Sequence, residues 1–373
     1  MDNSQVFYPF ETAPHSYFVI ENFEQAKKDF LDGNARFPVF VYHKRFTNDE
    51  IDERISKLID GTPAQQKLLL VKIAVKLQEN DSYLLSFKHL NNEIYGEVNC
   101  DYFDRVIKFM LAKYPDEKLE TICDNENCRE LVKYEENLPE KPLIDIKSFE
   151  MMRKYFQKYF CDLTPSKNLG EAMSKVFKKS KLAEKGWTLK EKEDSSHART
   201  ILKNKTITFG KDYKARSKDR YVYNSIALHE IFGHAIRETG AKVDNAESSE
   251  GWAVLLEQLN SHSLRTKRAY RYLAATLATG TYNGKELDFR ETYEIIWRLM
   301  SLSGRYRQSA AKKHAFDETA RVFRGGRPDL PGAVFLKDTS YLKGNLDIWD
   351  EIAKQKIDYL DFIDIIEGRK EIL

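Results

Sequence analysis

Hydrophobic side chains recur at helical spacing along most of the chain. Between residues 47 and 80 this three-to-four-residue period is carried by Ile51, Ile55, Leu58, Leu68, Leu69, Ile73 and Leu77. Such a period is typical of amphipathic helices. Similar patterns predict helices at residues 22–33, 101–114, 147–160 and 169–183, and through most of the chain after residue 220.

A different pattern separates two of these helical regions. Residues 186–194, 198–204 and 205–210 are short, rich in Thr, Ile and aromatic residues, and separated by turns, which predicts a small sheet. Residues 38–44 contain Val and aromatic residues in a similar run and predict one further short strand. The fold class expected from these patterns is α+β, mostly helical with a small β-sheet.

The polar segment 125–145 contains two prolines and is the best candidate for a boundary within the chain. It predicts an N-terminal, mainly helical lobe at residues 1–140 and a second part at residues 141–373. The length of 373 residues allows for two domains or one large one.

Composition narrows the function classes. Hydrophobic residues make up 42% of the chain, enough for a sizeable core. The 60 Lys and Arg almost balance the 58 Asp and Glu, so no nucleic-acid partner is expected. No secretory signal and no apolar run of membrane-spanning length are visible, so we expect a cytoplasmic protein without a membrane partner. Four cysteines exclude a disulfide scaffold, and Cys123 and Cys128 are expected to be free thiols.

The most informative segment is residues 221–240, which contains His229, Glu230 and His234. Zinc peptidases place a His-Glu-x-x-His pattern on one helical face, with the Glu as general base. This chain has one extra residue. On an ideal helix with His229 as the origin, Glu230 lies at about 100° and His234 at about 140°, opposite an arc of apolar residues. Two satisfied buried histidines are the alternative, but the adjacent Glu230 and the polar arc favour a metal site.

The extra residue predicts a distorted helix. A straight α-helix separates the two histidines too widely for one ion, whereas a π-bulge absorbs one residue and restores their alignment. Gly233 offers little steric resistance to this change. We therefore predict a locally widened helix between His229 and His234.

A catalytic zinc ion takes three protein ligands. The candidate for the third is Glu250, at the start of the next predicted helix, and Glu257 lies two turns later, where it is able to hold a ligating histidine by a hydrogen bond. Spacing alone leaves open whether these are solvated helix carboxylates.

These motifs resemble those of the tyrosine carboxypeptidase-like family, which includes the microtubule-associated tyrosine carboxypeptidases. The resemblance rests on His229, Glu230, His234 and Arg237, on the box at residues 249–253, and on C-terminal boxes at residues 321–325 and 335–338. Ser249 and Trp252 depart from the family box, where Glu and Leu are usual. The resemblance implies a zincin-like metallopeptidase fold with the sheet beside the metal-binding helix, a catalytic core at residues 141–373, and Glu250 as the third ligand.

The resemblance also implies an activity, the release of a C-terminal Tyr or Phe from a peptide or protein tail with one Zn²⁺ ion. Glu230 is then the general base, and Tyr341 is the candidate for a second donor to the oxyanion. The substrate carboxylate needs a cation, and the candidates are Arg237, Arg321, Arg324 and Lys337. Basic runs at residues 203–220 and 265–271 favour an acidic tail.

Two alternatives remain open. The sequence His-Glu-Ile-Phe-Gly-His also resembles the metal helix of dipeptidyl peptidase III, a zinc aminopeptidase whose members are far longer. The second alternative is a non-catalytic, metal-stabilised regulatory protein. Glu230 beside His229 argues against it, because a structural site needs no general base.

Overall fold

The computed structural model describes residues 17–42, 63–112, 123–193, 198–214, 219–239, 246–263, 269–302 and 306–372, together with residues 49, 53, 114, 117, 119 and 120. The chain divides into two compact units, each built from two segments. Unit 1 comprises residues 1–141 and 268–339, and unit 2 comprises residues 142–267 and 340–373. The boundary predicted from the sequence cuts the chain once, whereas these units cut it three times.

Unit 1 is helical. Its elements are α1 (Phe23–Leu31), α3 (Pro63–Leu77), η3 (Asp81–Tyr83), α4 (Leu84–Tyr95), α5 (Cys100–Leu111), α7 (Glu126–Glu136), α13 (Ala269–Thr279), α14 (Phe289–Leu302), α15 (Gln308–Phe323) and η7 (Leu336–Thr339). Helix α14 packs along α15. Phe30 of α1 contacts Phe289 and Phe316 edge-on or tilted, with ring centroids 5.2 and 5.4 Å apart, so aromatic side chains fill this core.

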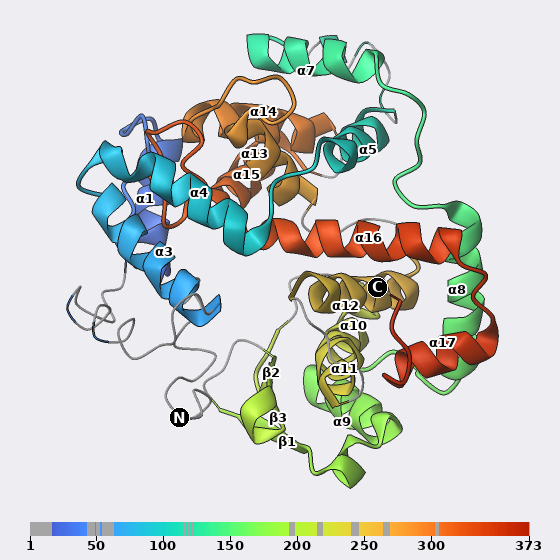
Figure 1. The fold of residues 1–373 in the computed structure, drawn as a ribbon. Helices are drawn as coiled ribbons and strands as arrows, with labels where there is room; N and C mark the ends of the chain where they lie inside the picture. Colours follow the sequence, from blue (N-terminus) through green and yellow to red (C-terminus); the bar gives the residue numbers. More distant parts are fainter. Residues whose placement is uncertain are drawn as a thin grey trace. The chain divides into compact units, whose positions relative to one another are not determined.

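Unit 2 combines helices with a small sheet (Figure 1). Its helices are α8 (Ile146–Tyr159), α9 (Leu169–Ser180), η4 (Leu182–Lys185), η5 (Leu202–Asn204), α10 (Val222–Leu228), η6 (His229–Ala235), α11 (Ile236–Thr239), α12 (Ala246–Ser261), α16 (Ser340–Lys354) and α17 (Tyr359–Ile366). Helix α12 packs against α16 on one side and against α10 and η6 on another. The side chains of Asp145 and Asn168 cap α8 and α9 by accepting hydrogen bonds from backbone amides of their first turns.

The sheet of unit 2 has the strand order β1-β3-β2. Strand β1 (Thr188–Lys192) pairs with β3 (Thr206–Gly210) in parallel, and β2 (Arg199–Ile201) pairs with β3 antiparallel. Strand β2 therefore lies at an edge. It contacts η6, so an edge of the sheet lies beside the widened part of the helix.

Most predicted elements are present, including the three strands and the helices near residues 22, 101, 147 and 169. The expected mostly helical α+β architecture is confirmed. The strand predicted at residues 38–44 is wrong for its described part, because only one isolated bridge, Ile20 to Tyr42, forms there. Phe40 instead packs its ring against Phe289 and Phe316. Residues 43–44, and residues 47–62 apart from 49 and 53, lie outside the described residues.

Residues 126–136, within the polar segment expected to be a boundary, form helix α7. Asn125 caps this helix, and Cys128 and Leu131 are buried on its inner face. No helix in the described part of the chain combines the length and the apolar character needed to cross a membrane.

Candidate metal centre

The helix that carries the histidines is widened where the sequence predicts it. Residues His229–Ala235 form a π-helix between α10 and α11, so the prediction of a bulge is confirmed. Gly233 has a second role there that the sequence did not reveal. A Cβ atom at this position would lie 2.5 Å from the Cβ atom of Ala253. The absence of a side chain at Gly233 thus lets α12 approach the π-helix closely.

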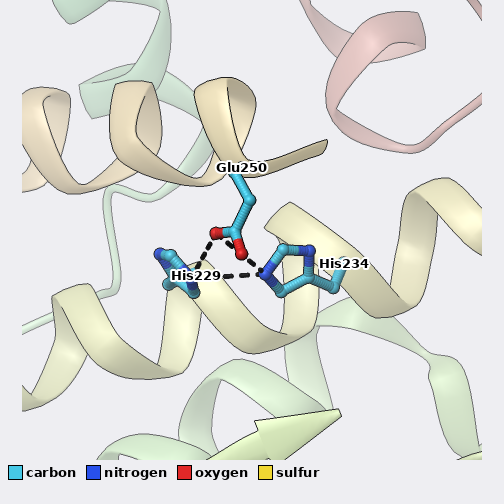
Figure 2. Close-up of side chains that lie close together, drawn as sticks. All are labelled: His229, His234 and Glu250. Atoms are coloured by element: carbon cyan, nitrogen blue, oxygen red, sulfur yellow. Dashed lines mark hydrogen bonds and ion pairs between the residues drawn. The ribbon is translucent and has the colours of Figure 1, made fainter. Parts of the chain in front are cut away.

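Three side chains meet where α12 faces the π-helix (Figure 2). His229 Nε2 and His234 Nε2 lie 3.2 Å apart. Glu250 Oε2 lies 3.5 Å from His229 Nε2 and 3.7 Å from His234 Nε2. Glu250 therefore completes a triangle of potential ligand atoms with the two histidines, as Figure 2 shows.

This triangle fits a zinc ion in both size and chemistry. Ligands at about 2.0–2.1 Å from a tetrahedral ion are about 3.3 Å from one another, and zinc is commonly bound by two imidazoles and one carboxylate in hydrolases. The observed separations of 3.2, 3.5 and 3.7 Å are close to that value. The three side chains are only 14–18% exposed, which suits a site that excludes most bulk water.

Each histidine is held through its second ring nitrogen by a residue of α12. Glu257 Oε1 lies 3.0 Å from His229 Nδ1, and Ser249 Oγ lies 2.7 Å from His234 Nδ1. Such partners fix the ring orientation and leave Nε2 for a metal. The sequence predicts this orienting role for Glu257 but not for Ser249.

Electrostatics at the site favour a positive charge. Burial lowers the pKa of the His229 imidazole, but the hydrogen bonds and charges of Glu250 and Glu257 outweigh this effect and raise the pKa to about 10. The two carboxylates thus stabilise a cation between them.

Helix α12 is itself anchored by a buried polar network. The side-chain amides of Gln258 and Asn345 hydrogen-bond to each other, and Trp349 Nε1 donates to Gln258 Oε1 at 2.8 Å. A Cβ atom at Gly251 would lie 2.1 Å from the carbonyl carbon of Gly344. Helices α12 and α16 therefore touch backbone to backbone one residue after Glu250, and this contact fixes where the carboxylate emerges.

Glu230, next to His229 on the π-helix, contacts the edge of the sheet. Thr200 Oγ1 lies 2.9 Å from Glu230 Oε2 and 2.8 Å from the backbone oxygen of the same residue. A pocket of about 260 Å³ adjoins these groups, and its lining comprises Ala198, Arg199, Thr200, Leu202, Glu230 and His234. The carboxylate next to the first histidine thus faces a space that a substrate is able to enter. Sequence reasoning did not find Thr200, because nothing in its strand pattern marks it.

Two other predicted residues lie in unit 2. Arg237 is 4% exposed, and its guanidinium carbon lies 5.5 Å from the centre of the Trp252 ring. This stacking interaction occupies one face of the guanidinium. Tyr341 is half-buried near the start of α16, the helix that packs against α12.

The remaining predicted cations lie in unit 1. Arg321 Nε and Arg324 Nη2 contact the buried Asp338 carboxylate at 3.1 and 3.2 Å. Arg271 joins the same carboxylate at 3.4 Å. Burial raises the pKa of Asp338, but the guanidiniums lower it well below its usual range. Lys337, on η7, is half-buried.

The two basic runs are described only in part. Residues 215–218 and 264–268 lie outside the described residues. In the first run, Lys211 pairs with Glu193 at 3.0 Å. In the second, Arg271 pairs with Glu318 and with Asp338 inside unit 1, so this arginine belongs to a structural ion-pair cluster.

Comparison with known proteins bears on the C-terminal half. Residues 239–365 match the family model described as microtubule-associated tyrosine carboxypeptidase. The predicted resemblance to this family is confirmed over these residues. The match to the microtubule-associated tyrosine carboxypeptidase family includes Glu250, Glu257 and Tyr341 and begins at Thr239, the last residue of α11, so it does not include the two histidines. No curated protein and no solved structure shows a significant match to the chain.

Proposed function

We propose that this chain is a zinc metallocarboxypeptidase that releases a C-terminal Tyr or Phe from a peptide or protein tail. The observation that carries the proposal is the convergence of His229, His234 and Glu250 next to Glu230 and a pocket. The family match supports the carboxypeptidase class. A sheet edge beside the metal helix supports a zincin-like arrangement.

In this proposal the side chains of His229, His234 and Glu250 hold the ion. Bound zinc supplies a Lewis acid, which acidifies water and polarises the scissile carbonyl. Glu230 accepts the proton of the attacking water and later delivers it to the leaving amine. Its position at the wall of the pocket supports this role, since a general base must lie within hydrogen-bond reach of the proton that it takes.

The developing oxyanion needs a hydrogen-bond donor from the protein. We propose the Tyr341 hydroxyl for this role. Its helix, α16, packs against the helix that carries Glu250, which supports the assignment. A Tyr341→Phe variant should keep its metal and its KM but lose kcat by about 100–1,000-fold, the effect typical of one oxyanion donor.

The carboxylate of the substrate needs a cation, and Arg237, Arg321, Arg324 and Lys337 are the proposed candidates. Arg321 has the most exposed side chain of the three arginines, at 47%, against 11% for Arg324 and 4% for the whole of Arg237. A bidentate contact with a carboxylate requires an accessible guanidinium edge. Arg321→Gln is therefore the first of these variants to test.

An acidic substrate tail is part of the proposal. Lys203, Lys205, Lys211 and Lys214 follow strand β2, which lines the pocket beside Glu230. Their charges would attract acidic residues upstream of the departing Tyr. Replacing those acidic residues by Gln in a peptide substrate should lower kcat/KM, and the difference should shrink as salt is added.

The decisive experiment combines metal analysis with three peptides. The bound metal is measured first. The chain is then incubated with three peptides: one ends in Tyr with a free carboxylate, one ends in amidated Tyr, and one has a free N-terminus from which a dipeptide can be released. Tyr should be released only where the terminal carboxylate is free. Glu230→Gln should retain zinc and lose at least about 100-fold in kcat.

Other outcomes separate the alternatives. Release of an N-terminal dipeptide would favour the dipeptidyl peptidase reading. A full complement of metal without turnover, and with Glu230→Gln indistinguishable from the wild type, would contradict both enzymes and leave a metal-stabilised regulatory protein.

A further inference from the structure

Thr200 occupies a distinctive place in unit 2. It is the middle residue of the edge strand β2 and pairs across the sheet with the fully buried Ile207 of β3. Side chains alternate between the two faces of a strand, so Thr200 points the opposite way from Arg199 and Ile201. Its side chain meets the π-helix at Glu230.

The hydroxyl of Thr200 contacts two different parts of that residue. It lies 2.8 Å from the backbone oxygen and 2.9 Å from carboxylate oxygen Oε2. A hydroxyl has one proton, which these two acceptors share. The backbone oxygen belongs to the widened turn, where the carbonyl ladder of a regular α-helix is displaced. The Thr200 side chain therefore links both the backbone of the widened turn and the Glu230 carboxylate to the sheet.

We propose that Thr200 is a positioning residue for the general base, an inference that rests on the proposed function. By holding Oε2, its hydroxyl fixes the rotamer of Glu230 and leaves Oε1 for the proton of the attacking water. The same hydroxyl restrains the backbone of the turn, so the carboxylate cannot rotate with a loosened helix. A general base needs this restraint because a displacement of about 1 Å costs on the order of 100-fold in rate.

The chain offers a conservative variant and a matched control. Thr200→Val keeps the shape of the side chain and removes the hydroxyl, whereas Thr200→Ser keeps the hydroxyl. Thr188→Val removes another hydroxyl of the same sheet, one that hydrogen-bonds to Thr206 at 3.0 Å and not to Glu230. Each protein is compared for zinc content, for kcat and KM on a peptide ending in Tyr, and for hydrogen exchange of residues 229–236.

Thr200→Val should lower kcat by about 10–100-fold while KM and zinc content stay unchanged. Thr200→Ser should recover to within about threefold of the wild type, and Thr188→Val should match the wild type. Hydrogen exchange over residues 229–236 should accelerate in Thr200→Val alone. A kcat of Thr200→Val within about twofold of the wild type would overturn the proposal, as would a Ser variant as impaired as the Val variant.

Failure of the proposed function gives a different result. In that case the wild type itself releases no Tyr, and the exchange comparison still decides whether Thr200 holds the turn. Unchanged exchange in Thr200→Val overturns the restraint. Loss of zinc from that variant also overturns it, since Thr200 would then act on the metal ligands and not on Glu230.

Discussion

Glu257 Oε1 lies 3.0 Å from Nδ1 of His229, two helical turns beyond the carboxylate that faces the other nitrogen of the same ring. One helix, α12, thus supplies both a predicted metal ligand and the group that orients a second ligand. The histidine ring is held on both sides by residues whose spacing is fixed by a single helix.

Removing this orienting carboxylate should weaken metal binding. We expect Glu257→Gln to lower zinc affinity by about 10–100-fold, since the amide orients the ring but no longer raises its basicity. Competition with a chromophoric chelator measures the change. Glu191→Gln, an exposed glutamate of β1, serves as the control and should bind zinc like the wild type. Equal affinity in the two variants would count against the role of Glu257.

Gly233 should tolerate no side chain. Its Cβ atom would lie 2.5 Å from Ala253 Cβ and 2.9 Å from Ala253 Cα, so Gly233→Ala must push α12 away from the π-helix. We expect a loss of about 1–3 kcal/mol of unfolding free energy together with weaker zinc binding, because Glu250 moves with α12.

The control for this variant is Gly170→Ala, within α9. A Cβ atom there meets its neighbours at 3.5 Å, an ordinary contact, and Ala has the higher helix propensity, so stability should be unchanged or rise slightly. Denaturant unfolding and chelator competition on both variants check the pair. Normal zinc affinity in Gly233→Ala would show that close packing at this position does not place Glu250.

Much of the candidate metal centre was predictable because it is local. The two histidines and Glu230 lie on one helix, and the extra residue between them has a known structural solution, the π-bulge. Glu250 and Glu257 were proposed from helical spacing, and their contact with the histidines depends on the packing of α12. This packing is set by close approaches at Gly233 and Gly251. Each of them joins residues far apart in sequence, and no periodic pattern in the sequence predicts them.

Other features depend on long-range contacts and were missed. Thr200 reaches Glu230 only because β2 is an edge strand beside the π-helix. The strand predicted at residues 38–44 has the right composition, but among the described residues 38–42 only Tyr42 forms a bridge, to Ile20. Strand formation requires a neighbouring strand, whereas a helix satisfies its own hydrogen bonds. The helices were accordingly predicted more reliably than this strand.

The Asp338 cluster makes a prediction about acid stability. Arg271, Arg321 and Arg324 lower the pKa of the buried Asp338 carboxyl in the folded protein, against the opposing effect of burial. Its contribution to stability is therefore fully present above the unfolded pKa of about 4, and it is lost as the pH falls toward the folded pKa.

Asp338→Asn leaves three guanidiniums without their shared carboxylate. It should lower the unfolding free energy by about 3–5 kcal/mol at pH 7. The difference from the wild type should shrink as the pH falls below about 4. In that range the unfolded wild type takes up a proton at Asp338 and the folded wild type does not, so the wild type loses stability. Urea unfolding at pH 7, 5 and 3 measures both effects. A difference that stays constant over this range would contradict the pKa shift.

Removal of the metal should increase hydrogen exchange mainly in unit 2. All three predicted ligands lie in that unit, on η6 and α12. Without zinc, the carboxylate and imidazoles lose the ion that joins these two elements. A ligand present at about 1,000 times its Kd contributes on the order of 4 kcal/mol to stability.

We expect chelation to speed hydrogen exchange in residues 229–235 and 246–261, with little change in α14 and α15 of unit 1. In the Glu250→Ala protein, hydrogen exchange in those segments should already be fast before chelation, and the chelator should not change its rate. An equal response in both units, or a Glu250→Ala protein that still responds, would place the metal elsewhere.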